Sequence, residues 1–424
     1  MHRKTIHYNN YKLHLINTKK FKTITFKIIF KSRINKEEIT IRNLLTDNLV
    51  MSTEKYPSVK KMGIKEQDLY GAYLRSSTKR TGNYSISEVT MSILNPIYTE
   101  KEMLEESLSL FHDVIFKPNV KNKEFNKEIF DILKNDLKSD ILANNDNPKA
   151  LSLIKLKESM GDYPFAYNMD GNIEDLERIT TKDLYEYFEN FYKNNIIDFY
   201  VVGDISSYNI EKIIKEKFIF NTENNKKINA DIDYKNTKNE IKEIKEETNF
   251  KQTNLSISCS INNMNDFERE FVVTLYNIIL GSSPCSKLFI NVREKNSLAY
   301  SISSYFRRSD SILIIIAGIS MDKYNETINE IKKSMEEIEK GQITDKELKD
   351  AKKLFITAME EINEYPESII NYYHSIDYFN AVPIKETKKA INSITKEDII
   401  KVANKIKIDT IYTLKEGDHE KDKH

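Results

Sequence analysis

Residues 179–184 read Ile-Thr-Thr-Lys-Asp-Leu, and half a chain later residues 394–399 read Ile-Thr-Lys-Glu-Asp-Ile. In each stretch a threonine precedes acidic residues, which is the pattern of a capped helix N-terminus. Each predicted helix is followed by a short apolar strand, Phe199–Val202 in the first half and Ile411–Leu414 in the second. Because the cap, the helix and the strand recur in the same order, we interpret the chain as a duplicated domain.

Two kinds of apolar spacing recur along the chain. Apolar residues alternate with polar ones in 24–30 and in 255–261, which predicts strands with one buried face. Residues 100–116 and 124–142 carry apolar side chains at helical spacing instead. We therefore expect a duplicated α+β domain. The expected boundaries are 1–215 for the first copy, 216–252 for a charged linker with an edge segment, and 253–424 for the second copy.

The composition argues against nucleic-acid and membrane partners. The 65 basic and 65 acidic residues cancel, so no net field favours a polyanion or an anionic membrane surface. No window approaches the roughly eighteen apolar residues of a membrane span, and residues 1–10 lack an apolar stretch of signal-peptide length. Cys259 and Cys285 form no metal-ligand spacing, so we expect a cytoplasmic protein with free thiols.

The most specific motif lies at residues 283–300, which read Ser-Pro-Cys-Ser-Lys-Leu-Phe-Ile-Asn-Val-Arg-Glu-Lys-Asn-Ser-Leu-Ala-Tyr. This stretch resembles the second-domain signature of the pitrilysin, or insulinase-like, family of zinc peptidases. The strand end at 201–204 and the stretch 162–184, with its Tyr-Pro pair and Gly171, agree with that resemblance. Residues 69–72, Leu-Tyr-Gly-Ala, additionally resemble a bacterial subgroup of YmfF type that lacks catalytic ligands.

The resemblance implies both a fold and a chemistry. The implied fold has two tandem homologous domains, each a mainly antiparallel sheet with helices packed on one side. The two domains face each other, and a second copy or a partner chain closes a chamber. The family's zinc sits on an inverted H-x-x-E-H motif of the first long helix, with a distal glutamate as third ligand. One open zinc position then holds a water whose proton the motif glutamate accepts.

The metal motif is degenerate in this chain. The matching helix is 39–51, and the register that best fits the following residues puts Asn43 and Asp47 at the ligand positions and Thr46 at the base position. Amide and hydroxyl groups are poor zinc ligands beside imidazole and thiolate. We therefore expect no metal and no catalytic residue in this chain. A shift by one position offers Leu44, Asp47 and Asn48, again without an imidazole.

No other residue restores the zinc site. The third ligand would come from the predicted helix 124–142, where Glu124, Glu128 and Asp136 remain open candidates. No two histidines are spaced four residues apart on a helix, so none forms a ligand pair. The histidines are His2, His7, His14, His112, His374, His419 and His424.

Two residues of the family pattern are present. Arg293 and Tyr300 match positions that, by resemblance, hold the substrate backbone beside the zinc. A guanidinium donates two charge-assisted hydrogen bonds, and a phenol can donate to an oxygen that gains charge. The alternative is structural: Arg293 pairs with a neighbouring acid, and Tyr300 is a core residue. We likewise interpret Tyr372–His374 as a helix surface or interface rather than a catalytic base.

Three functions compete on these observations. The first is a non-catalytic, substrate-binding subunit of a two-chain zinc peptidase, whose zinc and H-x-x-E-H motif lie in a homologous partner. The second is a structural or assembly scaffold without peptide handling, and the third is a self-sufficient enzyme of unfamiliar chemistry. The presence of Arg293 and Tyr300 favours the first. It predicts a peptide substrate, a hetero-oligomer with a homodimer as the alternative, and no nucleic-acid or membrane partner.

Overall fold

The computed structural model describes residues 2–221, 234, 240–379 and 381–416. The chain forms two compact units, and neither is one continuous stretch. Unit 1 contains the described residues 2–142, 168–221 and 363–374, and unit 2 contains the described residues 143–167, 234, 240–362, 375–379 and 381–416. Part of the linker expected at 216–252 lies outside the described residues. No helix in the described ranges is long and apolar enough to cross a membrane.

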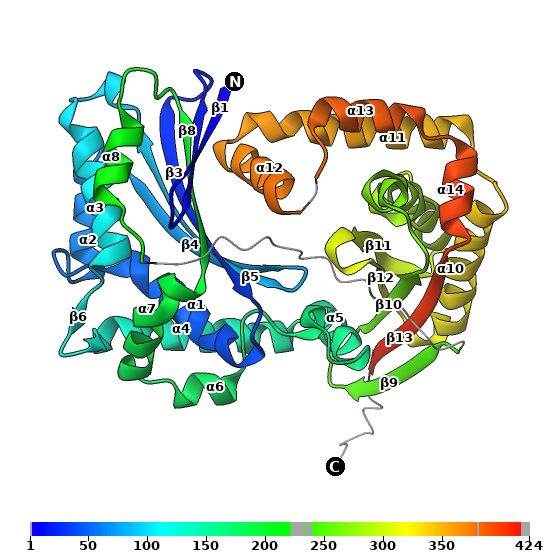
Figure 1. The fold of residues 1–424 in the computed structure, drawn as a ribbon. Coiled ribbons are helices and arrows are strands. Elements are labelled where there is room, and N and C mark those ends of the chain that lie inside the picture. Colours follow the sequence, from blue (N-terminus) through cyan, green and yellow to red (C-terminus); the bar gives the residue numbers. More distant parts are fainter. Residues whose placement is uncertain (1, 222–233, 235–239, 380, 417–424) are drawn as a thin grey trace, which may run out of the picture. The chain divides into compact units, whose positions relative to one another are not determined.

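Unit 1 is built on a sheet whose described strands run in the order β1-β2-β8-β3-β5-β4 (Figure 1). Neighbouring strands are antiparallel except β2 and β8, which are parallel. A two-residue hairpin, β6 with β7, lies apart from this sheet. The bounds are β1 His2–His7, β2 Lys12–Asn17, β3 Thr23–Arg33, β4 Tyr73–Thr81, β5 Tyr84–Leu94, β6 Val120–Lys121, β7 Glu124–Phe125 and β8 Ile196–Gly203.

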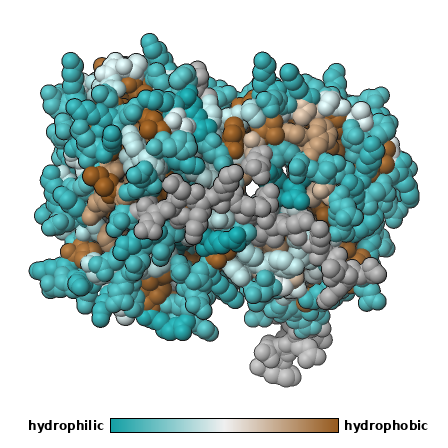
Figure 2. Space-filling model, in the orientation of Figure 1, coloured by the Kyte–Doolittle hydropathy of each residue, from teal (hydrophilic) through white to brown (hydrophobic). Residues whose placement is uncertain are grey.

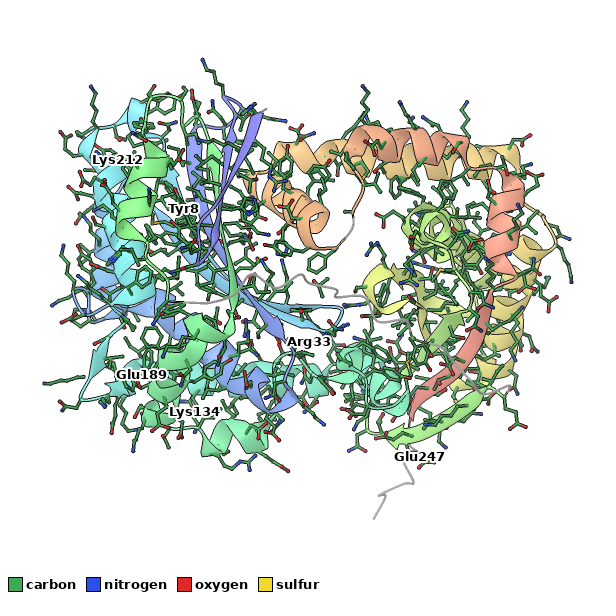
Figure 3. The ribbon with its side chains drawn as sticks, in the orientation of Figure 1. Tyr8, Arg33, Lys134, Glu189, Lys212 and Glu247 are labelled. Carbon is green, nitrogen blue, oxygen red and sulfur yellow. The ribbon has the colours of Figure 1, made fainter. Side chains whose placement is uncertain are left out.

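Unit 2 repeats this arrangement. Its described strands run in the order β11-β12-β10-β13-β9, and again one pair, β13 with β9, is parallel. The path β9-β13-β10-β12-β11 thus matches β2-β8-β3-β5-β4 of unit 1 strand for strand, which confirms the duplicated α+β fold. Glu247 of β9, labelled in Figure 3, pairs with Lys415 of β13 at 2.5 Å and holds this edge strand. The bounds are β9 Lys242–Thr248, β10 Thr253–Ile261, β11 Ala299–Arg307, β12 Ile312–Ile319 and β13 Ile406–Glu416.

Helices cover the sheets of both units. In unit 1, α3 and α8 lie on one face of the sheet (Figure 1). Lys134 of α4, labelled in Figure 3, donates to the carbonyl oxygens of Glu177 and Ile179, both at 3.0 Å, and so ties α4 to the end of α6. The first eight helices are α1 Ile39–Met51, α2 Val59–Asp68, α3 Glu102–Phe116, α4 Lys127–Asp146, α5 Pro148–Ser159, α6 Ile173–Arg178, α7 Thr181–Asn194 and α8 Ile210–Lys217.

The remaining helices follow β10 along the chain. The helical segment that follows β10 contains two π-helical turns, Glu268–Val272 and Ile278–Ser282, on either side of α9, and a third π-helical turn covers Phe289–Lys295. Such turns are rare and occur frequently at functional sites. The helices are α9 Val273–Asn277, α10 Tyr324–Glu339, α11 Asp345–Glu361, α12 Pro366–Tyr378, α13 Ile384–Ser393 and α14 Lys396–Ala403.

The caps predicted from the repeated motif are present. Thr180 accepts from the amide of Asp183 at 3.2 Å, and the Asp183 carboxylate accepts from the amide of Thr180 at 2.9 Å. Thr395 and Asp398 exchange the same two bonds at 3.3 and 2.9 Å. Each cap satisfies amide groups that a helix N-terminus leaves without intrahelical partners. The sequence repeat is therefore a repeat of local structure.

Each sheet is covered on its second face by a helix from the other half of the sequence. Helix α5 packs on β10 and β13 of unit 2, where Ser152 donates to Ser256 at 2.8 Å. In unit 1, residues 366–374 of α12 contact the sheet on the side of Lys27, where Glu367 lies 3.0 Å from the Lys27 ammonium. On the molecular face drawn in Figure 2, hydrophobic surface occurs as separate patches among hydrophilic residues.

Candidate functional site

Helix α1 carries the positions at which the resemblance places zinc ligands and a base. Asn43 donates its amide to the carbonyl oxygen of Met169 at 2.6 Å. Thr46 donates its hydroxyl to the carbonyl oxygen of Arg42 at 2.7 Å. Both side chains are buried and each donates a hydrogen bond to a backbone carbonyl oxygen. They therefore contribute to the packing of the helix.

Asp47 faces the edge strand β4. Its carboxylate accepts a hydrogen bond from the hydroxyl of Ser76 at 2.6 Å. Burial raises the pKa of the Asp47 carboxyl, the hydrogen bond from Ser76 offsets part of that rise, and the negative charge of Asp140 adds to it. A zinc ligand must be deprotonated, and this environment disfavours the charged form of the carboxyl.

The third-ligand candidates lie elsewhere than expected. Glu124 lies in strand β7 rather than on the predicted helix, because α4 begins only at Lys127, and it accepts from Thr181 at 3.3 Å. Glu128 and Asp136 are exposed on α4. The carboxylate of α4 that acts on Asp47 is Asp140, which the sequence reasoning missed. Its position one turn after Asp136 places it on the same helix face, and that spacing could have revealed it.

These residues do not fit a zinc ion. Two of the three motif positions carry an amide and a hydroxyl, which are poor zinc ligands, and the third is a carboxyl in an environment that disfavours its charged form. The alternative register fits no better, since Leu44 packs in the core and Asn48 is a buried carboxamide. His14 lies on β2, where its ring bonds Asp198 at 2.7 Å. Within the described ranges no three His, Cys, Asp or Glu side chains come together as a metal site.

Arg293 and Tyr300 come together in unit 2. Both line a cavity of about 640 Å³ that also contains Asp322 and Lys323. A second cavity of about 300 Å³ shares Tyr300, so this side chain borders both. The cavities offer cationic, anionic and phenolic groups within one surface, which suits a polar, extended ligand such as a polypeptide backbone.

A β-bulge presents Tyr300. Ala299 opposes Ile319 and Ser301 opposes Gly318 on β12, so Tyr300 is the extra residue between two paired positions. Bulges re-aim a side chain and are frequent beside active sites. Tyr300 is 65% exposed, so the alternative that it belongs to the core is wrong.

Arg293 is held from its own helical segment and remains accessible. Its guanidinium lies 5.0 Å from the ring centroid of Phe289, and its nearest acid is Glu294 at 4.0 Å. The Arg293 side chain is 44% exposed and that of Glu294 58%, and an exposed pair at this distance contributes little to stability. The alternative of a structural ion pair for Arg293 therefore has weak support.

The segment that carries Arg293 is anchored to its surroundings by polar contacts. The buried Asn291 donates to Ser334 of α10 at 3.2 Å. The amide of Leu298 donates to the carbonyl oxygen of Val292 at 2.8 Å, and Ser297 adopts a φ of 49° in the intervening turn. These contacts fix the spacing between the π-helical turn and β11, and hence between Arg293 and Tyr300.

Of the two alternatives for Tyr372–His374, a helix surface or an interface, the second describes His374. His374 is only 4% exposed, so it does not lie on a helix surface. It packs edge-on against Tyr200 of β8 with ring centroids 6.3 Å apart. Burial lowers the pKa of His374 well below its usual value, and the charge of Lys31 lowers it further. The neutral form of this histidine is part of the contact between α12 and the sheet of unit 1.

Comparison with known proteins gives matches over the whole chain. Residues 178–355 match the family model described as the peptidase M16 inactive domain. The probable inactive metalloprotease YmfF of Bacillus subtilis (strain 168) is 27% identical over 406 residues, which are 95% of each chain.

Solved structures show the same fold. A conserved protein from Enterococcus faecalis V583 superposes with a TM-score of 0.91 at 23% identity, covering 99% of this chain and 100% of its own. The peptidase M16 inactive domain from Pseudomonas fluorescens gives a TM-score of 0.78 at 18% identity, with 99% of each chain covered. The resemblance deduced from residues 283–300 is thereby confirmed: the chain is similar to an inactive M16-type metalloprotease over nearly its whole length, and its sequence lacks the H-x-x-E-H motif.

Proposed function

We propose that this chain is the non-catalytic, substrate-binding subunit of a two-chain zinc metallopeptidase that cleaves peptides or small polypeptides. The partner is a homologous subunit that carries the H-x-x-E-H motif and the zinc. The two chains close a chamber around the peptide, and this chain supplies binding groups to it. Because Cys259 and Cys285 are both free, the proposal places the assembly in a reducing, cytoplasmic compartment.

The observation that carries this proposal is the shared cavity of Arg293 and Tyr300. A structural remnant would be expected to bury these side chains or to bond them within the fold. Arg293 instead keeps an exposed guanidinium whose fork can donate to a carboxylate or to backbone carbonyl oxygens. Tyr300 keeps an exposed hydroxyl that can donate to a carbonyl oxygen.

The state of helix α1 supports the division of labour. The side chains of Asn43 and Thr46 donate hydrogen bonds to backbone carbonyl oxygens. The helix is therefore well packed but supplies no reactive group. A relative named as probably inactive spans nearly the whole chain. The chemistry of peptide hydrolysis must then come from a second polypeptide.

The test is a reconstitution with a homologous subunit that carries the H-x-x-E-H motif. We expect this chain alone to cleave no peptide, and the mixture to cleave faster than the homologue alone. Arg293→Ala and Tyr300→Phe should slow the mixture without changing its assembly or zinc content. If Tyr300 donates to an oxygen that gains charge, its loss costs about a hundredfold to a thousandfold in turnover. Loss of a ground-state contact would instead raise KM and leave turnover unchanged.

Matched controls exist within the chain. Arg307→Ala removes an exposed arginine of the same strand, and Tyr365→Phe removes the hydroxyl of a tyrosine that is 66% exposed. Neither residue lines either cavity. We expect both controls to cleave as the unmodified mixture does. Unchanged rates in Arg293→Ala and Tyr300→Phe with an intact complex would favour the scaffold function instead.

A further inference from the structure

Residues 363–374, here called the strap, belong to unit 1, although the chain on both sides of them belongs to unit 2. The strap contains most of α12, and its Ile369 and Ile370 are buried. It contributes no strand to the described sheet of unit 1, whose strands all lie between residues 2 and 203. The strap can therefore leave the sheet without breaking the pairing of any described strand.

The sheet face beneath the strap is polar. Lys27 of β3 lies directly opposite Thr90 of β5 and Tyr200 of β8. His14 of β2 in turn lies opposite Tyr200, so these four side chains share one face. Such a face is readily hydrated when it is uncovered, whereas an apolar face would resist the loss of its cover. Charged residues in register with these four on the same face include Lys31, Arg75, Lys79, Glu88 and Asp198.

Two acids of the strap hold it to unit 1, in different surroundings. Glu367 lies 3.0 Å from the ammonium of Lys27, whose side chain is 1% exposed, and it also pairs with Arg75. Glu364 lies 2.5 Å from Lys20, and both of these side chains are exposed. Water screens the exposed pair, so that pair contributes little. Loss of the Glu367 charge would instead leave a buried ammonium with one carboxylate fewer, so Glu367 is the main electrostatic attachment of the strap.

His374 is a titratable group at the end of the strap, and basic side chains surround it. Burial lowers its pKa well below the usual value, and Lys31 of β3, Lys79 of β4 and His14 of β2 lower it further. Asp198 of β8 opposes that decrease, but its carboxylate already pairs with Lys31 and, at 2.7 Å, with His14. A protonated His374 would therefore add a cation to a buried site whose carboxylate is already paired.

We propose that the strap is a proton-sensitive switch: protonation of His374 makes it leave the sheet face as one piece, while the sheet of unit 1 stays folded. In the docked strap the His374 ring packs against Tyr200 of β8 and is almost fully buried, so it stays neutral. In the released strap water hydrates the imidazolium. The released state therefore binds the extra proton, and its population rises as the pH falls below about 6.5. The switch is independent of the proposed peptide-binding cavity, because Arg293 and Tyr300 lie in unit 2.

Hydrogen exchange of the purified full chain, followed peptide by peptide, tests the proposal. An isolated helix of the length of α12 is marginal in water, so the amides of the strap exchange when the strap is released. The pKa of His374 is about 6.5 in the released strap and well below that in the docked strap, so the opening equilibrium should rise about tenfold between about pH 7.5 and 5.5. Exchange of residues 367–374, divided by the intrinsic rate at each pH, should rise by that factor. Exchange of residues 24–30 of β3 should not rise, because the sheet stays folded.

Substitutions in the strap separate the protonated group from the electrostatic attachment. His374→Asn should remove the pH response, because asparagine does not titrate. Glu367→Gln should raise the exchange of the strap by about tenfold or more at both pH values and keep the pH response, because Lys27 loses a carboxylate partner. Glu364→Gln is the matched control, since it removes the same charge from an exposed pair of the same strap, and it should change the exchange by less than about twofold.

Three results would overturn the proposal. The first is an equal corrected exchange rate of the strap at both pH values in the unmodified chain. The second is a parallel loss of protection in β3, which would show that unit 1 unfolds as a whole. The third is a pH response that persists in His374→Asn, which would assign the proton to another group. The first two results come from the unmodified chain, so they decide the matter even if a variant fails to fold.

Discussion

Gly281 is the position where one methyl group should disturb the candidate site most. It lies in the π-helical turn that packs against β11. A Cβ built there would lie 2.5 Å from the Oγ of Ser304 and 2.8 Å from the Cδ1 of Leu288. Both distances are shorter than a carbon atom tolerates, so Gly281→Ala must displace its neighbours.

The cost follows from what the displaced groups do. The Ser304 hydroxyl donates to the buried Asn277 side chain at 2.7 Å. Moving it leaves a buried acceptor unsatisfied, at about 1–3 kcal/mol. Overpacking of a filled interior adds about 1–3 kcal/mol. We expect Gly281→Ala to lower the free energy of unfolding of unit 2 by roughly 2–6 kcal/mol.

The assay is urea unfolding followed by hydrogen exchange, because two units need not unfold in one step. Exchange should increase in residues 268–307 of unit 2 and remain unchanged in unit 1. Gly63→Ala is the matched control, since no atom lies within 4 Å of its added Cβ on α2, and helix propensity should make it neutral or slightly stabilising. Ser304→Ala combined with Gly281→Ala should recover about 1 kcal/mol, because the clashing oxygen is gone. Wild-type stability in Gly281→Ala would refute the reasoning.

Three further results are expected. The pKa of His374 is lowered in the folded state, so the unfolded chain binds a proton at a pH at which the folded chain does not. The free energy of unfolding should therefore fall as the pH drops below about 6.5. His374→Asn should flatten this dependence in urea titrations between about pH 5.5 and 8. The pKa of Asp47 is raised, so the charged form of this carboxyl opposes folding at a pH above that pKa. Asp47→Asn, with Ser76 still donating its hydrogen bond to the side chain, should therefore raise the melting temperature at pH 8 but not at pH 4. Because Asn43 and Thr46 donate to backbone carbonyls, elemental analysis should find well below one zinc per chain, and a chelator should leave the melting temperature unchanged.

The sequence predicted the repeated elements because they depend on local rules. The Thr180 and Thr395 caps follow from helix-end chemistry, and the strands β3 and β10 follow from side-chain period; the structure confirms both. The expectation that these strands have one buried face was wrong, because the polar residues that alternate along them are buried as well. Boundaries were less accurate. Asn122 and Lys123 adopt left-handed backbone angles and form the turn between β6 and β7. Glu124 therefore lies in β7, before α4 begins.

The candidate site was predicted in part. The family resemblance singles out Arg293 and Tyr300, and the structure places both at one cavity. The bulge that exposes Tyr300 depends on the pairing of β11 with β12, which no local pattern specifies. The spacing from Asp136 places Asp140 on the same helix face, but its electrostatic effect on Asp47 joins two helices that are far apart in the sequence.

The cover of each sheet could not be deduced from alternation at all. On β3 the residues that alternate with the apolar core include Lys27, and a polar alternate face ordinarily indicates contact with water. In the structure Lys27 is only 1% exposed, and its ammonium lies 3.0 Å from both Glu88 of β5 and Glu367 of α12. Burial lowers the pKa of Lys27 and the charge of Glu88 opposes that shift. Such buried pairs add little net stability, but an uncompensated partner is costly. Because Lys27 would lose an anionic partner under any other cover, it disfavours arrangements in which a surface other than α12 packs on this face. The polar residues of β3 therefore make the packing of α12 specific.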